Sequence, residues 1–208
     1  MKKSILLLFM LIPGPLLAMD FTLGLRAGTA VSPVPAGGAE MFLHFGDLAF
    51  GISYVTGATE IKDMIDDDSD VSEVEQAEAT AELALFEMQY TLFWGLNSRV
   101  GIGQRTMGLN YIIRDINSDG TLEGTLEGTS LVISHSVGFE WHFDWFYIAL
   151  DGAGIAYPGQ TTATAEMETN GDISGDIETE ITELEEAAYD MSHVLTKQLF
   201  LFRFGLLF

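Results

Sequence analysis

Apolar and polar residues alternate with a period of two along most of this chain. In residues 86–94, for example, Phe86, Met88 and Tyr90 alternate with Glu87 and Gln89. A period of two predicts a β-strand whose side chains point alternately to two faces. Eight such runs are predicted, at residues 21–30, 40–45, 48–54, 86–94, 99–114, 131–143, 146–151 and 198–208.

The fifth run changes parity part-way along. Its first apolar residues, Val100 and Ile102, have even numbers. Its later apolar residues have odd numbers, namely Met107, Leu109, Tyr111 and Ile113. A one-residue β-bulge between Gly103 and Met107 would return both sets to one face of the sheet. We therefore predict a bulge at this place.

The composition of the two faces distinguishes a soluble sandwich from a membrane barrel. One face is aromatic and aliphatic, and the other consists of Gly, Ser, Ala and Thr with a few charges. A face with so few charged and large polar side chains is unusual for the surface of a soluble protein. We predict that the apolar face meets lipid and that the small face fills the narrow lumen of an eight-stranded barrel. Buried charges must pair. The predicted lumen ion-pair residues are Arg26, Glu40, Glu87, Arg99, Arg105, Glu140, Asp151, Lys197 and Arg203.

Short and long connections alternate between the predicted strands. The short ones are Gly46-Asp47, residues 95–98 and a turn around Asp144. The three tryptophans, Trp94, Trp141 and Trp145, lie beside these turns, where an aromatic girdle would sit. Short turns at one end and long loops at the other are typical of outer-membrane barrels. The predicted fold is all-β, an eight-stranded antiparallel up-and-down transmembrane barrel with long acidic extracellular hairpin loops.

The N-terminus has the pattern of a secretory signal peptide. Lys2 and Lys3 precede an apolar stretch, and Ala18 offers a small residue for cleavage. Residues 1–18 are therefore predicted to be removed, and residues 19–208 to form the barrel. The chain has no cysteine, so neither a lipid anchor nor a disulfide is expected.

Acidic residues are concentrated in the long connections. The sequence has 31 Asp and Glu against 9 Lys and Arg, a net charge of −22, which becomes −24 when Lys2 and Lys3 are removed. Ten of the acids lie in residues 60–82 and ten in residues 166–190. Such a charge excludes nucleic acid as an expected partner, because phosphate binding needs a basic surface.

The signal peptide, the alternating strands and the terminal phenylalanine resemble the small outer-membrane β-barrels of diderm bacteria, the OmpX-like, OmpA-transmembrane-like and OmpW-like proteins. The resemblance implies a bacterial outer-membrane location, contact with membrane lipid and lipopolysaccharide, and a monomer. It also implies that the last strand is read by the barrel-assembly machinery. The matching assembly-signal residues are Phe200, Phe202, Phe204, Leu206 and Phe208.

Two acidic connections resemble hairpins that rise beyond the membrane. ATEIKDMI (residues 58–65) and TTATAEMET (residues 161–169) alternate, and Asn170-Gly171 supplies a turn. Raised hairpins of this kind in OmpX-like proteins imply surface contact, so the expected role is surface interaction, adhesion or cell-envelope structure, with an extracellular partner that the sequence does not name. Acidic hairpins that only prevent aggregation are the alternative. No cofactor is expected, and Ca²⁺ or Mg²⁺ is expected to bind these loops diffusely.

A third acidic connection resembles a calcium loop. Its candidate metal ligands are Asp115, Asn117, Asp119 and Glu123, with Gly120 at the bend. The position that would supply a bidentate acid is Leu126, and the acid follows at Glu127. A simple hairpin turn at Asp119-Gly120 is the favoured interpretation.

The residues bear on two other functions, a lipid A-modifying enzyme and a narrow channel. Lipid A-modifying enzymes share this architecture, but a serine hydrolase needs a His beside its Ser, and Ser134, His135 and Ser136 alternate between faces. We expect no catalytic residues. A narrow channel for small hydrophobic solutes, as in OmpW-like proteins, needs an apolar lumen, and Phe42, Phe93, Leu199, Leu201 and Leu207 are predicted to face inward.

Overall fold

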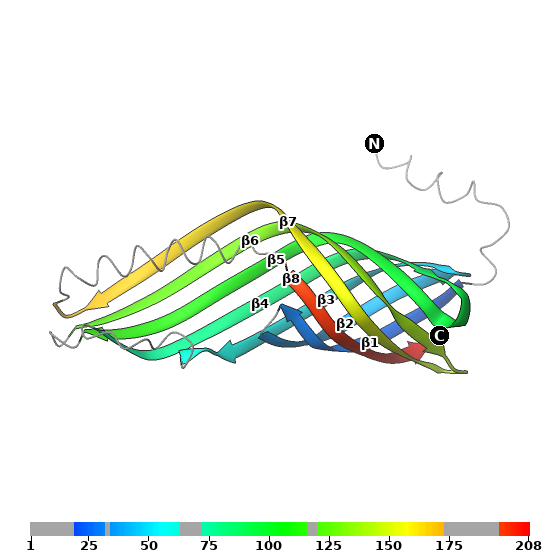
Figure 1. Cartoon of the computed structure of the whole chain (residues 1–208), viewed down its shortest axis with the longest axis horizontal. Helices are drawn as coiled ribbons and strands as arrows, with labels where there is room; N and C mark the ends of the chain where they lie inside the picture. Colours follow the sequence, from blue (N-terminus) through cyan, green and yellow to red (C-terminus); the bar gives the residue numbers. More distant parts are fainter. Residues whose placement is uncertain (1–18, 32–33, 63–71, 116–119, 173–195) are drawn as a thin grey trace.

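The alternating runs form eight antiparallel strands that close into a barrel in this computed structural model (Figure 1). The structure describes residues 19–31, 34–62, 72–115, 120–172 and 196–208. Each strand pairs with the next, and β8 pairs with β1. The predicted eight-stranded up-and-down barrel is confirmed. The strands are β1 (Met19–Val31), β2 (Val34–Phe45), β3 (Leu48–Glu60), β4 (Ser72–Thr91), β5 (Leu96–Asp115), β6 (Thr121–His142), β7 (Phe146–Asn170) and β8 (Thr196–Leu207).

Closure brings the two described chain ends together. The Phe208 N–H donates to the Phe21 carbonyl at 2.8 Å, and the Phe21 N–H donates to the Phe208 carbonyl at 3.1 Å. The last residue is therefore tied into the sheet, which removes the exposed edges that an open sheet would present. Of the helices in the described residues, none has the length and apolar character to cross a membrane.

Three short turns lie at the same end of the barrel as these termini. Gly46, with φ of 64°, turns β2 into β3. The short 3₁₀ helix η2 (Phe93–Gly95) turns β4 into β5, with positive φ at Trp94 and Gly95. This turn lies earlier than the predicted residues 95–98, because Leu96 already pairs with Phe139 on β6. The third turn is closed by the Phe143 N–H, which donates to the Phe146 carbonyl at 2.8 Å.

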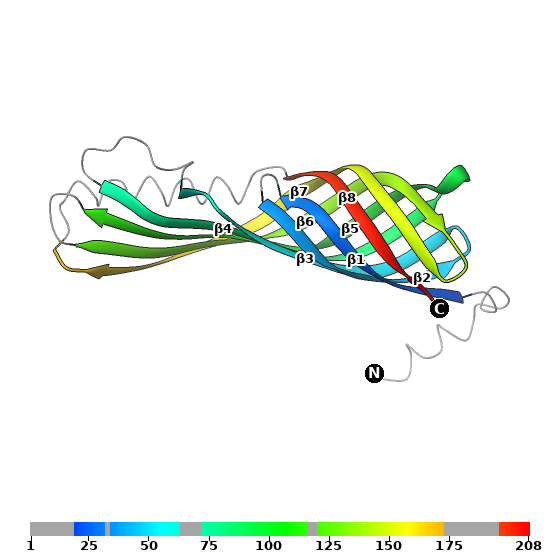
Figure 2. The ribbon, with the colours of Figure 1, turned by 90° about the horizontal axis from the view of Figure 1, so that it is seen from below.

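Four strands run on beyond the other four. Strands β4 to β7 have 20 to 25 residues each, whereas β1, β2, β3 and β8 have 12 or 13. Figures 1 and 2 show β4 to β7 leaving the barrel together, at the end opposite the short turns. We call this part the protruding sheet and define it as residues 72–82, 106–115, 121–129 and 162–170. Its lowest row of paired residues is Glu82, Thr106, Thr129 and Thr162.

The two faces of the strands exchange character where the protruding sheet begins. In the barrel the outward side chains are apolar: Phe86, Ile102 and Ile133 are each at least 50% exposed. In the protruding sheet the apolar side chains are instead buried on the inner face, as Val74, Ala77, Leu109, Tyr111, Ile113, Leu122 and Leu126, with Ile61 and Met167 packed against them. We call the opposite side the acidic face and define it by the exposed residues Glu78, Glu82, Glu123, Glu127, Glu166 and Glu168.

This exchange of faces replaces the predicted bulge in β5. The pairing of β5 with β4 and with β6 runs without a register shift from Asn97 to Ile112. Val100 and Ile102 point outward from the barrel, and Leu109 and Tyr111 are buried on the inner face. The predicted bulge is wrong. The apolar residues of β5 lie on the outer face in the barrel and on the inner face in the protruding sheet, so their parity changes while the register of the strand does not.

The predicted acidic hairpins are described in part. β3 pairs with β4 as far as Glu60 and Glu78, and β7 continues as a strand through TTATAEMET to Asn170. Gly171 has φ of 94°, as a turn glycine would. The returning half of the last hairpin, the tip of the second loop and the signal peptide lie outside the described residues.

Candidate functional site

Charged side chains meet inside the barrel, and each comes from a different strand. They form ion pairs with one another, have inward parity, and are each at most 5% exposed. We call this set the lumen cluster. Its members among the described residues are Arg26 on β1, Glu40 on β2, Glu87 on β4, Arg99 on β5, Glu140 on β6, Asp151 on β7 and Arg203 on β8.

Glu40 is the centre of the lumen cluster. Its Oε2 lies 3.1 Å from Nη2 of Arg99 and 3.4 Å from Nε of Arg26. Its Oε1 lies 3.1 Å from Nη1 of Arg203 and accepts a hydrogen bond of 2.6 Å from the Tyr147 hydroxyl. One buried carboxylate thus joins the guanidinium groups of Arg26 and Arg203, which are direct partners on β1 and β8, to that of Arg99 on β5.

The other carboxylates complete the cluster. Glu87 lies 3.0 Å from Arg26 and 3.5 Å from Arg99. Asp151 lies 3.0 Å from Arg203 and 3.5 Å from Arg99, and Arg203 Nη1 also lies 2.9 Å from Glu140. Among the described side chains the cluster therefore has three guanidinium groups and four carboxylates.

Small residues on the inner face make room for these long side chains. A Cβ at Gly24 would collide with the Tyr147 hydroxyl and lie 3.3 Å from Cγ of Glu40. A Cβ at Gly101 would lie 3.0 Å from Cγ of Glu87. The glycines that alternate with apolar residues in the sequence thus mark the places where charged side chains cross the lumen.

The structure brings together seven of the nine residues predicted as lumen ion pairs. Arg105 is buried on the inner face of β5 but is not a member of the lumen cluster, and the side chain of Lys197 lies outside the described residues. Sequence reasoning did not single out Tyr147 or Gln89, which bind Glu40 and Glu140 respectively. Their inward parity was the available signal.

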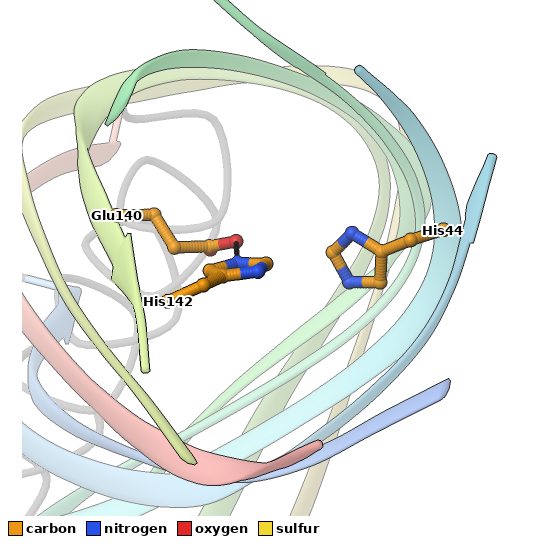
Figure 3. A group of neighbouring side chains, drawn as sticks. All are labelled: His44, Glu140 and His142. Carbon is orange, nitrogen blue, oxygen red and sulfur yellow. Dashed lines mark hydrogen bonds and ion pairs between the residues drawn. The ribbon is translucent and has the colours of Figure 1, made fainter. Parts of the chain in front are cut away.

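A second group of side chains lies beside the lumen cluster, near the short turns. Glu140 and His142 both extend from β6, and His44 faces them from β2 (Figure 3). Their potential ligand atoms all lie within 4.8 Å of one another. His142 Nε2 is 2.6 Å from Glu140 Oε1, and the Thr22 hydroxyl is 3.1 Å from Nε2 of His44. We call His44, Glu140 and His142 the His–Glu–His group.

The predicted calcium loop is described only at its edges. Asp115 is buried, and Glu123 is exposed on the acidic face, so the two point to opposite faces of the sheet. Asn117 and Asp119 lie outside the described residues. The Asp115 N–H donates to the Gly120 carbonyl at 3.0 Å, as in a hairpin connection.

The acidic face places like charges on neighbouring strands. Glu123 pairs directly with Glu168, and Glu60 pairs directly with Glu78. Like charges in direct cross-strand pairs destabilise a sheet. A hollow on this face is lined by residues that include Glu78, Glu123, Glu166 and Glu168. This surface is therefore suited to a positively charged partner.

One serine–histidine pair lies on the outer face of the barrel. Ser98 Oγ is 3.1 Å from Nε2 of exposed His135, across the β5–β6 pair. In the sequence, Ser134 and Ser136 are the serines beside His135. Ser98 is brought near His135 by the register between β5 and β6. The expectation of no enzymatic activity stays a prediction.

The C-terminal strand shows the alternation expected of an assembly signal. Phe202, Phe204, Leu206 and Phe208 are exposed on the outer face. Arg203 and Gly205 point inward between them, and the side chain of Phe200 is outside the described part of β8. Recognition by an assembly machinery stays a prediction.

Comparisons with known proteins give similar solved structures only. No family model matches the sequence, and no curated protein matches it. Ail, the attachment invasion locus protein of Yersinia pestis, is similar with a TM-score of 0.48 and 8% identity, over 91% of this chain and 97% of that one. CarO of Acinetobacter baumannii has a TM-score of 0.44 and 13% identity, over 90% and 96%. A major outer membrane protein from Thermus thermophilus has a TM-score of 0.45 and 12% identity, over 92% and 100%.

The lumen cluster predicts a barrel that does not conduct. Its side chains come from seven strands and are nearly fully buried, so they leave little room for ions to pass. Of the residues predicted to make the lumen apolar, Phe42 is buried inside, whereas Phe93 is 67% exposed in a turn. We expect no resolved current steps when the folded protein is inserted in a planar lipid bilayer, with a porin as the positive control. Reproducible single-channel steps would contradict this expectation.

Proposed function

We propose that this chain is an integral β-barrel of the bacterial outer membrane, with the short turns in the periplasm and the protruding sheet outside the cell. The barrel exterior carries apolar side chains, including Leu25, Phe86 and Ile133, each at least 50% exposed. Water would disfavour such a surface, while lipid would favour it. The tryptophans beside the short turns, Trp94, Trp141 and Trp145, are also exposed, as in an interfacial girdle.

We infer that the protruding sheet is the working part, acting in surface interaction or in the structure of the envelope. The exchange of faces at its base is the observation that carries this inference. Above that level the sheet has its own buried apolar cluster and an exposed acidic surface, as a sheet in water would. A strand region built for water and continuous with one built for lipid fits a barrel that projects from the membrane.

The acidic face explains how such a sheet would act. Direct pairs such as Glu123 with Glu168 repel each other unless cations lie between them. Divalent cations would relieve this repulsion and could bridge the face to anionic lipopolysaccharide or to another acidic surface. Because no rigid set of ligands is needed for such bridging, the expected binding is weak and spread over several carboxylates.

A charge-neutralised variant tests this role. In it, Glu78, Glu123, Glu166 and Glu168 are replaced by Gln. We expect equilibrium dialysis to show fewer weakly bound Ca²⁺ ions per folded barrel than in the wild type. Cells that carry the variant should also admit more of a hydrophobic dye after mild Ca²⁺ depletion.

The control neutralises two carboxylates at the other end of the molecule. Asp47→Asn and Asp144→Asn remove exposed carboxylates beside the short turns. They should leave Ca²⁺ binding and dye uptake near wild-type values. Equal loss in both variants would mean that net charge, and not the acidic face, determines binding. Heat-modifiable migration on a denaturing gel would verify that each variant is a folded barrel.

A further inference from the structure

We propose that the His–Glu–His group at the short-turn end of the lumen is a binding site for Zn²⁺. This site is separate from the acidic face, and it does not depend on the proposed surface role. Two imidazoles and one carboxylate form one of the ligand sets that proteins use for zinc when one coordination position is left for water. The three ligands come from β2 and β6, which do not pair with each other, so the barrel itself brings them together.

The distances fit a site that closes slightly around an ion. Ligand atoms on one tetrahedral zinc lie about 3.3 Å apart, given bonds of about 2.0–2.2 Å. The three candidate ligand atoms all lie within 4.8 Å of one another, and the Glu140–His142 pair, hydrogen-bonded at 2.6 Å, would open to about 3.3 Å as the ion replaces the shared proton. The His44 and His142 rings meet edge to face, with centroids 5.5 Å apart (Figure 3). A small rotation of the His142 side chain, which is 42% exposed, would bring both rings onto one ion.

Neighbouring groups hold two of the three ligands in place. The Thr22 hydroxyl is hydrogen-bonded to Nε2 of His44 at 3.1 Å. Glu140 is held through both oxygens, by Gln89 Nε2 at 3.1 Å from Oε1 and by Arg203 Nη1 at 2.9 Å from Oε2. Such outer partners fix the orientation of metal ligands and add to metal affinity.

Glu140 is the carboxylate next to the two histidines, and it would supply the negative charge that offsets part of the charge of a divalent ion.

The site is exposed to solvent at His142. His44 and Glu140 are buried, whereas His142 is exposed near the turn that joins β6 to β7. An ion would enter from the short-turn end and keep water in its remaining position. In the orientation proposed above, that water is periplasmic.

Zinc titration of the folded barrel tests the proposal. The protein, folded in detergent micelles and freed of metal with a chelator, is titrated with Zn²⁺ by calorimetry in excess Mg²⁺, which competes with Zn²⁺ for any weak binding to surface carboxylates. We expect one Zn²⁺ per barrel, and at least about tenfold weaker binding for His142→Ala and for His44→Gln. Replacement of Zn²⁺ by Co²⁺ should give the visible absorption of a tetrahedral nitrogen–oxygen site.

Two further variants make the result decisive. His135→Ala removes an exposed histidine outside the group and should leave Zn²⁺ affinity unchanged. Thr22→Val keeps all three ligands and should weaken binding about tenfold, through the loss of the support on His44. The proposal is overturned if no saturable site remains in excess Mg²⁺, or if His142→Ala binds Zn²⁺ as the wild type does. The Gln variant of the acidic face should bind Zn²⁺ normally, so failure of this proposal and failure of the surface role can be told apart.

Discussion

Arg99→Met is expected to destabilise the folded barrel by about 3–5 kcal/mol, because it breaks buried ion pairs and leaves carboxylates uncompensated. Arg99 is 1% exposed, lies within 3.5 Å of Glu40, Glu87 and Asp151, and has its guanidinium 4.5 Å from the centre of the Phe42 ring. Without it, two guanidinium groups of the described cluster face four carboxylates. Urea unfolding in lipid vesicles, followed by tryptophan fluorescence, would measure the loss.

The same substitution at the surface provides the control. Arg114 and Glu75 form an ion pair of 3.2 Å whose side chains are 58% and 37% exposed. Arg114→Met should cost no more than about 1 kcal/mol, because water screens such pairs. Equal losses for the two variants would show that the lumen cluster contributes no more than a surface pair.

Phe86→Arg is expected to cost about 2–4 kcal/mol, the penalty for a cation on the lipid face near the middle of a bilayer. Phe86 is 54% exposed on β4, between Ile52 and Ile102 on the neighbouring strands. In a water-soluble protein the same exposed position would tolerate arginine with little change in stability. Unfolding in vesicles therefore tests the proposed membrane location directly.

Glu78→Arg is the matched control for this substitution. Glu78 lies on the same strand and the same outward parity as Phe86, but on the acidic face. We expect a change within about 0.5 kcal/mol, as for most exposed surface positions. If Phe86→Arg is tolerated as well as Glu78→Arg, the barrel exterior does not lie in lipid.

The barrel was predictable from the sequence because alternation is a local property of the chain. The alternation around a residue such as Phe86 or Phe139 shows which side of that strand is apolar. Eight such runs with short turns on one side leave a closed up-and-down barrel as the natural arrangement. The lumen charges followed from the same alternation, since Glu40, Arg99 and Arg203 occupy the small-residue parity.

What was missed depends on contacts between strands or on a change of surroundings. The exchange of faces could be mistaken for a bulge, because both explanations shift the parity of Leu109 and Tyr111 relative to Val100. The Ser98–His135 pair depends on the register between β5 and β6. The sequence shows that His44, Glu140 and His142 share the inward parity near the short turns, but the approach of His44 to the other two depends on the curvature of the barrel.

The unbroken strands of β5 and β6 have a mechanical consequence. The hydrogen-bond ladder between them passes from the barrel into the protruding sheet without a register shift, whereas β7 shifts its register against β6 between Ser130 and Val132, at the base of the sheet. The ten or so residues beyond that level reach about 30 Å along the strand. A force applied to the end of the protruding sheet would be transmitted to the barrel through the continuous β5–β6 ladder.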